Sequence, residues 1–355
     1  MTLEPVPGRD WGWRRYRPGD EHALMELFNA EFGLNRSIEH WRWQFADNPY
    51  GGPYIILAER LSDGMLVGSH VAMPFPLNVL GLPRVGGHTL DLVVHHDFRR
   101  QGIFETTARS CFDWMAGEGV AAVVAFPNAS SYPGFVRSLG WHRIVFPHRW
   151  DLRVGTRGLS GGSLSRAAGP VLDVPVRAWS RLALYLRDVK RDSTIRVVSS
   201  VPATVDDLWE RIRSGEVLSL WKDRKYLAWR YDANPDHVFE YVCLEEAGAL
   251  TALAVVTTLG SRLMVCELLA PVGSPAAARR LVTGITRIAV ERGHDGVGFI
   301  GHDAGRFAGA FSGFHRRVAH ENVFCGRPLT TDPVLAERFA LPGNWTLTFG
   351  DGDFV

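Results

Sequence analysis

The sequence predicts an α+β protein of two tandem domains, each a mixed, largely antiparallel sheet flanked by helices. Three observations predict it: an internal repeat, the same order of helical and strand patterns in both halves, and a Gly- and Ser-rich segment between the halves. A chain of 355 residues is long enough for two domains, each with its own core. Its 46% apolar and 22% charged residues are ordinary for a globular protein.

The repeat centres on a tryptophan-containing motif that ends in Asn-Pro. Residues 40–49 (HWRWQFADNP) can be laid over residues 226–235 (YLAWRYDANP), which places Trp43 on Trp229. Further matches follow in the same order: residues 54–57 with 241–244, residues 91–94 with 267–270, and residues 139–143 with 312–316. Such an ordered recurrence is the signature of a duplicated unit. We expect the tryptophans of these segments mainly in the core, with some lining a groove.

Each half then shows the same succession of elements. An opening strand (residues 13–17 or 194–198) precedes a helix, which starts after Pro18-Gly19-Asp20 in the first half and is capped by Thr204 in the second. After the repeated motif, two apolar runs joined by a Gly-containing turn predict a hairpin. The remaining elements are a strand that ends at Val94 or Ala270, a long amphipathic helix, an apolar strand (121–126 or 297–300), a short helix and a last strand.

The segment between the halves has its own composition. Residues 156–169 are rich in Gly and Ser and predict a linker. Residues 174–188 interleave apolar residues with Arg, a pattern typical of an amphipathic connecting helix. We therefore expect domains at residues 1–155 and 194–355, with the linker and its helix at 156–193.

Charge and cysteine usage exclude several classes of protein. The formal net charge of +1 argues against nucleic-acid binding, which needs a basic excess. The four cysteines show no metal-ligand spacing and are expected as buried thiols of a reducing compartment. The N-terminus is polar and broken by proline, and no apolar run is long enough to span a membrane. These features favour a cytoplasmic protein, and the dominance of Arg over Lys favours a high-GC bacterial genome.

The stretch most informative about chemistry joins the strand that ends at Val94 to a helix over residues 105–117. Arg99-Arg100-Gln101-Gly102 lies at the start of that helix. Free N–H groups and the positive end of the helix dipole favour an anionic ligand such as a pyrophosphate. Gly102 allows close approach of the backbone, and the arginines can add charge-assisted hydrogen bonds.

At these residues the chain resembles the GNAT superfamily of acyl-CoA-dependent N-acyltransferases, whose signature is an R/Q-x-x-G-x-G/A turn. It reads here as Arg99-Arg100-Gln101-Gly102-Ile103-Phe104, and Phe104 replaces a small residue, which we expect to tighten the turn. A second family motif is similar to Asn128 followed by Leu139-Gly140-Trp141. The resemblance covers residues 13 to about 153 well and the second half more weakly.

This resemblance implies a site for acyl-CoA as co-substrate. The coenzyme A pyrophosphate would bind residues 99–104, and Asn128 would contribute from the second motif. Pantetheine would pair with the backbone of the fourth strand of the fold, which corresponds here to Leu92, Val93 and Val94.

Catalysis requires removal of a proton, because an amine with a pKa of about 10.4 is mostly protonated at neutral pH. His88, six residues before Val94, is the first candidate base, and a strand residue with a solvated ring is the alternative. Asp91 is the second candidate, although its recurrence as Glu267 also fits a structural acid. The tyrosine that many family members use as acid corresponds here to Val136, so Tyr132 is the candidate substitute, with a core or capping role as the alternative.

Two further stretches are not expected to bind a coenzyme or a metal. Residues 271–280 (PVGSPAAARR) replace the phosphate turn in the second half, so we expect this half to keep the fold, lose coenzyme binding and shape the acceptor pocket. His95-His96-Asp97 is not expected to bind a metal, because adjacent strand residues point to opposite faces. No metal is therefore expected.

The function expected from these features is transfer of an acetyl or longer acyl group from acyl-CoA to a primary amine, with an amino sugar as first acceptor. Direct attack in a ternary complex would need no covalent enzyme intermediate. Two alternatives stay open: an aminoacyl or peptidoglycan-type transferase, which the good coenzyme A turn disfavours, and an acyl-CoA-binding pseudoenzyme, which the missing tyrosine favours. A homodimer is one option for the oligomeric state.

Overall fold

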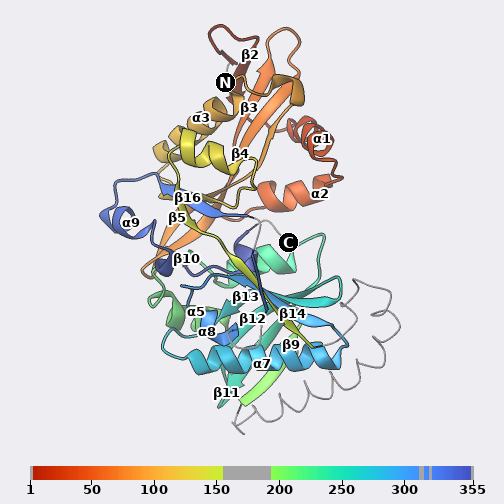
Figure 1. Cartoon of the computed structure of the whole chain (residues 1–355), viewed down its shortest axis with the longest axis vertical. Coiled ribbons are helices and arrows are strands. Elements are labelled where there is room, and N and C mark those ends of the chain that lie inside the picture. The colour runs from red at the N-terminus through yellow and green to blue at the C-terminus, as the bar shows by residue number, and fades with distance from the viewer. Residues whose placement is uncertain (1–2, 155–192, 312–315, 320–321, 353–355) are drawn as a thin grey trace.

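The computed structural model describes residues 3–154, 193–311, 316–319 and 322–352, and side chains in all of these except 316–319. The predicted linker and connecting helix lie outside these residues. Two mixed sheets flanked by helices make up the described chain, which confirms the expected fold class (Figure 1).

The first sheet has the strand order β1-β2-β3-β4-β5-β6-β16-β7, and β10 is added to β4. Its strands are β1 (Glu4–Pro5), β2 (Trp11–Arg15), β3 (Tyr54–Arg60), β4 (Leu66–Val79), β5 (Leu82–Val94), β6 (Ala122–Ala125), β7 (His142–Val145), β10 (Leu218–Leu220) and β16 (Phe324–Pro328). Its helices are α1 (Glu21–Phe32), α2 (Ile38–Trp41), the π-helical turn η1 (Arg42–Ala46), the 3-10 turn η2 (His96–Phe98), α3 (Ile103–Gly117) and the π-helical turn η3 (Gly134–Ser138).

The second sheet has the order β15-β8-β14-β13-β12-β11-β9. Its strands are β8 (His148–Arg153), β9 (Ser193–Val198), β11 (Phe239–Glu246), β12 (Ala249–Leu259), β13 (Arg262–Leu269), β14 (Gly296–Gly301) and β15 (Arg316–Ala319). The helices of this half are α5 (Val205–Arg213), α6 (Arg224–Leu227), the π-helical turn η4 (Ala228–Asp232), α7 (Pro275–Glu291), α8 (Ala308–Phe311), α9 (Pro333–Arg338), η5 (Pro342–Asn344) and η6 (Phe349–Asp351).

The two sheets exchange strands. β8 belongs to the first half in sequence but lies in the second sheet between β14 and β15. β16 comes from the second half and lies in the first sheet between β6 and β7. Each sheet is therefore completed by the other half of the chain, an arrangement that the sequence patterns did not indicate.

The structure shows the repeat as two equivalent local geometries. Both copies of the motif end in a π-helical turn, η1 and η4, at corresponding positions. The preceding N-caps also correspond, because Ser37 accepts from the backbone N–H of His40 and Asp223 accepts from that of Tyr226. One duplicated unit explains these matched caps and turns.

The two motifs meet at the boundary between the halves. Trp43 donates its indole N–H to the carbonyl of Trp229 at 2.8 Å, and Trp229 donates to the carbonyl of Trp43 at 2.9 Å. Their rings are stacked with centroids 6.0 Å apart. Both side chains are buried, so these tryptophans are core residues of the boundary, as expected for most of the set.

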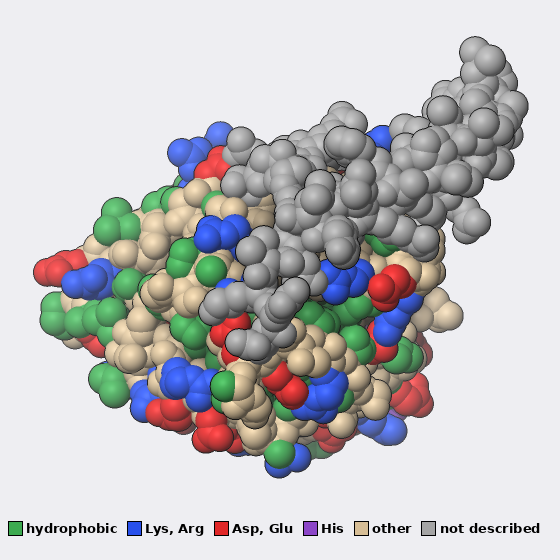
Figure 2. All heavy atoms as spheres, turned by 90° about the horizontal axis from the view of Figure 1, so that it is seen from below, with side chains coloured by type: hydrophobic (Ala, Val, Ile, Leu, Met, Phe, Trp, Pro, Cys, Tyr) green, Lys and Arg blue, Asp and Glu red, His purple; other side chains and the backbone are tan. Residues whose placement is uncertain are grey.

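Helices cover both faces of the first sheet. Alternation along β3 directs Ile55 and Leu57 to the core shared with α1 and α2, whereas Ile56 packs in the cluster that contains α3 (Figure 1). On the face of the second half seen in Figure 2, basic and acidic side chains are interspersed, in keeping with the small net charge. Among the described helices, none has the length and apolar character needed to cross a membrane.

Candidate functional site

In the first sheet, β5 and β6 stop pairing partway along β5, and we call the opening between them the wedge. Within the described residues, the two parallel strands pair only where Gly86–His88 meets Ala122–Val124, although β5 continues to Val94. On the other edge of β5, the register with β4 shifts between Ser69 and Val71. Such a bulge bends a strand, so beyond His88 one backbone edge of β5 is turned away from β6.

The bulge carries a residue in an unusual conformation. Asp91 has φ 50°, in the left-handed region that non-glycine residues rarely adopt. The predicted pantetheine-binding residues Leu92, Val93 and Val94 follow it directly along the open side of the wedge. Val93 and Val94 pair with β4 on their closed edge, which fixes their position.

The predicted phosphate turn leads from β5 into α3. Arg100 has φ 64° and Gly102 has φ 88°, so two left-handed residues flank Gln101 just before the helix begins at Ile103. Gly102 is the N-cap, and no side chain caps this end of the helix. Successive N–H groups in such a turn form a concave site for an anion. A non-glycine residue held at positive φ costs on the order of 1–3 kcal/mol, and such strain clusters at ligand sites.

Phe104, the departure from the family pattern, packs against η3. Its ring meets that of Phe135 edge to face with centroids 5.5 Å apart, and it covers Gly134. A Cβ atom at Gly134 would come within 2.7 Å of the Phe104 ring. The glycine thus accommodates the aromatic residue, and the pair joins the start of α3 to η3.

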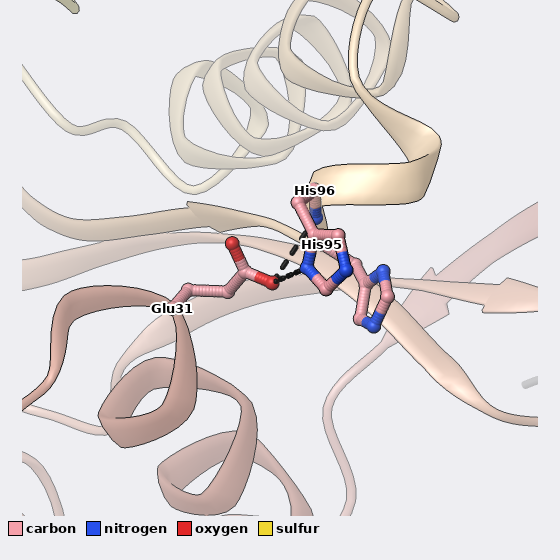
Figure 3. A group of neighbouring side chains, drawn as sticks. All are labelled: Glu31, His95 and His96. Carbon is pink, nitrogen blue, oxygen red and sulfur yellow. Dashed lines mark hydrogen bonds and ion pairs between the residues drawn. The ribbon is translucent and has the colours of Figure 1, made fainter.

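Arg99, at the start of the turn, is paired with an acidic residue of α1. Its guanidinium lies 2.6 Å from Glu31 of α1, and the same carboxylate accepts from the backbone N–H of His96 at 3.0 Å. The His96 ring is 2.7 Å from Glu31, and this interaction raises the pKa of His96 (Figure 3). Glu31 therefore ties α1 to the loop that precedes the turn.

His95 and His96 lie beyond β5, which ends at Val94, so strand alternation does not separate them. Their rings are stacked with centroids 4.3 Å apart (Figure 3). Ligand atoms of Glu31, His95 and His96 lie within 4.8 Å of one another, so the prediction that strand alternation keeps the two histidines apart was wrong. The Arg99 cation on the same carboxylate opposes a second cation at this position.

His88 stands at the apex of the wedge. It is the last residue of β5 paired with β6, and only 5% of it is exposed, so its ring is buried rather than solvated. The ring meets Phe126 edge-on with centroids 6.0 Å apart. Its partner on β4, Met73, belongs to the core shared with α1 and α2, so His88 faces the side of the sheet opposite α3.

Asp91 forms an ion pair with Arg36, a residue that the sequence analysis did not single out. Arg36 lies in the loop between α1 and α2, where Asn29 holds its backbone through both N–H and carbonyl at 3.0 and 3.1 Å. Its guanidinium also lies 4.7 Å from the centre of the Phe28 ring. This pairing gives Asp91 a structural partner that a free general base would lack.

Asn128 and Tyr132 lie together in the loop after β6. The Asn128 side-chain oxygen accepts from the backbone N–H groups of Ser130 and Ser131, and its carbonyl accepts from the N–H of Tyr132 at 3.0 Å. Asn128 is exposed and Tyr132 is half-buried. The loop is thus shaped by Asn128, which leaves its amide N–H₂ available at the surface.

The second half has a corresponding opening between β13 and β14, and a C-terminal segment of the chain occupies it. β13 and β14 pair at Arg262–Val265 with Gly296–Phe299, and a register shift between β12 and β13 matches the bulge in the first sheet. The turn η6 contacts both strands, and Gly350 packs so closely on the carbonyl of Cys266 that a Cβ atom would lie 3.1 Å away. A C-terminal segment of the chain therefore occupies the place where the first sheet is open.

Comparisons with known proteins agree with this geometry. Residues 13–144 match the family model described as "Acetyltransferase (GNAT) domain". No curated protein matches the chain in sequence.

Solved structures show the same fold over most of the chain. A GCN5-related N-acetyltransferase from Kribbella flavida has a TM-score of 0.62 at 15% identity, with 90% of this chain and 71% of that one covered. One from Anabaena variabilis has a TM-score of 0.65 at 9% identity, with coverage of 90% and 73%. Saccharomyces cerevisiae N-myristoyltransferase with bound myristoyl-CoA has a TM-score of 0.59 at 10% identity, with coverage of 92% and 83%.

The family match, the wedge and the turn before α3 all fall in the first half, and the likeness to solved structures extends the fold to both halves. Residues 13–144 therefore match a GNAT acetyltransferase domain, and both halves share the fold of the N-acyltransferase structures to which the chain is similar.

Proposed function

We propose that the first half binds acyl-CoA and transfers its acyl group to a primary amine. The observation that carries the proposal is the combination of the open wedge beyond His88 with the left-handed turn at Arg100 and Gly102. The turn presents N–H groups to a diphosphate, and the edge of Leu92–Val94 that faces away from β4 offers backbone groups to pantetheine. Arg99, Arg100, Gln101, Ile103 and Phe104 complete the turn, and Asn128 lies in the loop after β6.

The proposed reaction is direct attack within a ternary complex. The amine nitrogen forms a bond to the thioester carbon, and the carbon–sulfur bond breaks to release coenzyme A. The ammonium form of the acceptor first loses one proton to become the attacking amine, and the nitrogen loses a second proton as the amide forms. The departing thiolate takes up one proton, so one proton is released to solvent. His88 is the proposed base, because it ends the paired part of β5 and faces the sheet side opposite α3. Tyr132 is the proposed acid, and Asp91 is assigned a structural role with Arg36.

The acceptor that we propose first is an amino sugar, and the acyl group is acetyl or longer. The likeness to a protein with bound myristoyl-CoA supports keeping long acyl chains within the proposal. The filled wedge of the second half supports a single acyl-CoA site per chain. The division of the chain at residues 156–193, the cytoplasmic location and the homodimer stay predictions of the sequence.

Calorimetric titration of acetyl-CoA and longer acyl-CoAs tests the site. Arg100→Glu places a carboxylate at the proposed diphosphate site, and Arg84→Glu makes the same charge change at an exposed position far along β5. A charge-assisted contact of about 1.5–3 kcal/mol corresponds to roughly 10- to 150-fold in affinity, and charge reversal should cost at least that. Equal weakening by both variants, or no binding of any acyl-CoA, would contradict the proposed site.

A further inference from the structure

Two ion pairs occupy corresponding positions in the two copies of the internal repeat. Arg36 lies four residues before His40, and Lys222 lies four residues before the corresponding Tyr226. Each cation is followed by the N-cap of the next helix and pairs with an acid at the bulge of its own sheet. The first pair is Arg36 with Asp91, and the second is Lys222 with Glu267.

In the second half this pair has a further partner. The ammonium of Lys222 lies 2.9 Å from a carboxylate oxygen of Asp351 and 2.8 Å from the hydroxyl of Thr348. Both residues belong to the C-terminal segment that packs on the bulge, so they come from outside the repeated unit. The cation therefore holds one carboxylate from the strand and one from a segment that fills the wedge.

In the first half the pair is more open. The side chains of Arg36 and Asp91 are 18% and 8% exposed, whereas those of Lys222 and Glu267 are 3% and 0% exposed. Within the residues that the structure describes, no carboxylate except that of Asp91 pairs with Arg36. Solvent thus reaches the first cation, whereas the second is enclosed by its own chain.

The first cation is an arginine, a residue type that can bind a second anion beside Asp91. Lysine is a compact point charge, which suits a fixed internal partner such as Asp351. Arginine offers several N–H donors in a planar fork and can bind two carboxylates through different edges. Asn29 holds the backbone of Arg36 and the guanidinium lies against the Phe28 ring, so the fork is positioned before any ligand arrives.

We propose that Arg36 binds a carboxylate of the acceptor, in the way that Lys222 binds Asp351 of its own chain. The acceptor is then a primary amine that carries a carboxylate close to the amine. This inference rests on the proposed function, since it places the amine in the wedge beside the thioester. Two sources share this chemistry: α-amino acids, and amino sugars that carry an acid group.

Matched pairs of amines test the inference. Amino acids are compared with their carboxamides, and 2-amino-2-deoxyglucuronic acid with 2-amino-2-deoxyglucose, by following release of the coenzyme A thiol from acetyl-CoA. We expect the carboxylate form of a pair to have at least a tenfold higher kcat/KM, with the difference mainly in KM. The pair that shows this preference identifies the source of the carboxylate.

Variants assign the preference to Arg36. Arg36→Gln should reduce the preference at least tenfold and leave acyl-CoA affinity unchanged, and Arg36→Lys should retain part of it. Arg42→Gln, at an exposed position in η1, is the matched control and should retain all of it. Thermal melting of each variant shows that it is folded.

The outcomes separate the two proposals. Absence of acyl-CoA binding would overturn the proposed function itself. If acyl-CoA binds, the inference is overturned by equal turnover of the two forms, by absence of turnover of every carboxylate-bearing amine, or by an equal loss on both forms in Arg36→Gln.

Discussion

The buried cluster around Lys222 gives the largest expected effect on stability. The side chain of Lys222 is 3% exposed and bridges the carboxylates of Glu267 and Asp351, which are 0% and 1% exposed. Lys222→Met would keep much of the side-chain volume and leave both carboxylates without a cation. Removing one partner of a buried ion pair costs about 3–5 kcal/mol, so we expect a loss in this range at pH 7.

Urea unfolding followed by circular dichroism measures this loss. A triple variant, Lys222→Met with Glu267→Gln and Asp351→Asn, makes the cluster neutral and should recover most of the loss, because no buried charge remains. A loss below about 1 kcal/mol for the single variant would refute the reasoning, since such a value is typical of an exposed pair. A triple variant as unstable as the single one would show that packing, rather than charge, is responsible.

Three further predictions follow from the geometry. Gly134→Ala should destabilise the chain by about 1–3 kcal/mol through overlap with the Phe104 ring, and Phe104→Ala in the same chain should relieve the overlap. Urea unfolding of both single variants and the double variant measures this, and additive changes in the free energy of unfolding would contradict the contact. Burial raises the pKa of Asp351 from 3.8 to about 6, so its contribution to stability is present below pH 4 and is lost as the pH rises through 6. The difference in unfolding free energy between the unaltered chain and Asp351→Asn, measured by urea unfolding, should therefore fall over that range. A constant difference would contradict the prediction. His88→Gln should lower kcat by about 10²- to 10⁴-fold at saturating acyl-CoA without changing acyl-CoA affinity, and an unchanged kcat in steady-state assays would remove His88 as the base.

Much of the first half could be predicted because its signals are local. The turn at residues 99–104 is read from glycine, arginine and the start of a helix, and the structure places it before α3 with two left-handed residues. The repeated tryptophan motif predicted a duplicated unit, and matched π-helical turns show it. These features depend on neighbours in sequence, which a single chain displays directly.

The strand exchange could not be predicted in this way. β16 pairs with β6 across about 200 residues of sequence, and a short apolar strand has no local property that names its partner. The filling of the second wedge is equally non-local, because Gly350 and Asp351 meet the bulge only in the folded chain.

Two residues carried signals that sequence reasoning missed. Extending the repeat by four residues would have matched Arg36 with Lys222, each followed by a capping residue. Lys222 is also one of few lysines in an arginine-rich chain, and its side chain is buried. The stacking of His95 on His96 was missed because alternation was applied past the end of β5.

The most direct test of the central claim is the mass of the product formed from an acyl-CoA and a carboxylate-bearing primary amine. The account predicts an amide heavier than the amine by one acyl group, formed together with an equal amount of free coenzyme A. It also predicts that Arg100→Glu loses this product at acyl-CoA concentrations that saturate the unaltered chain. Hydrolysis of acyl-CoA without amide formation, or amide formation that Arg100→Glu leaves intact, would contradict the account.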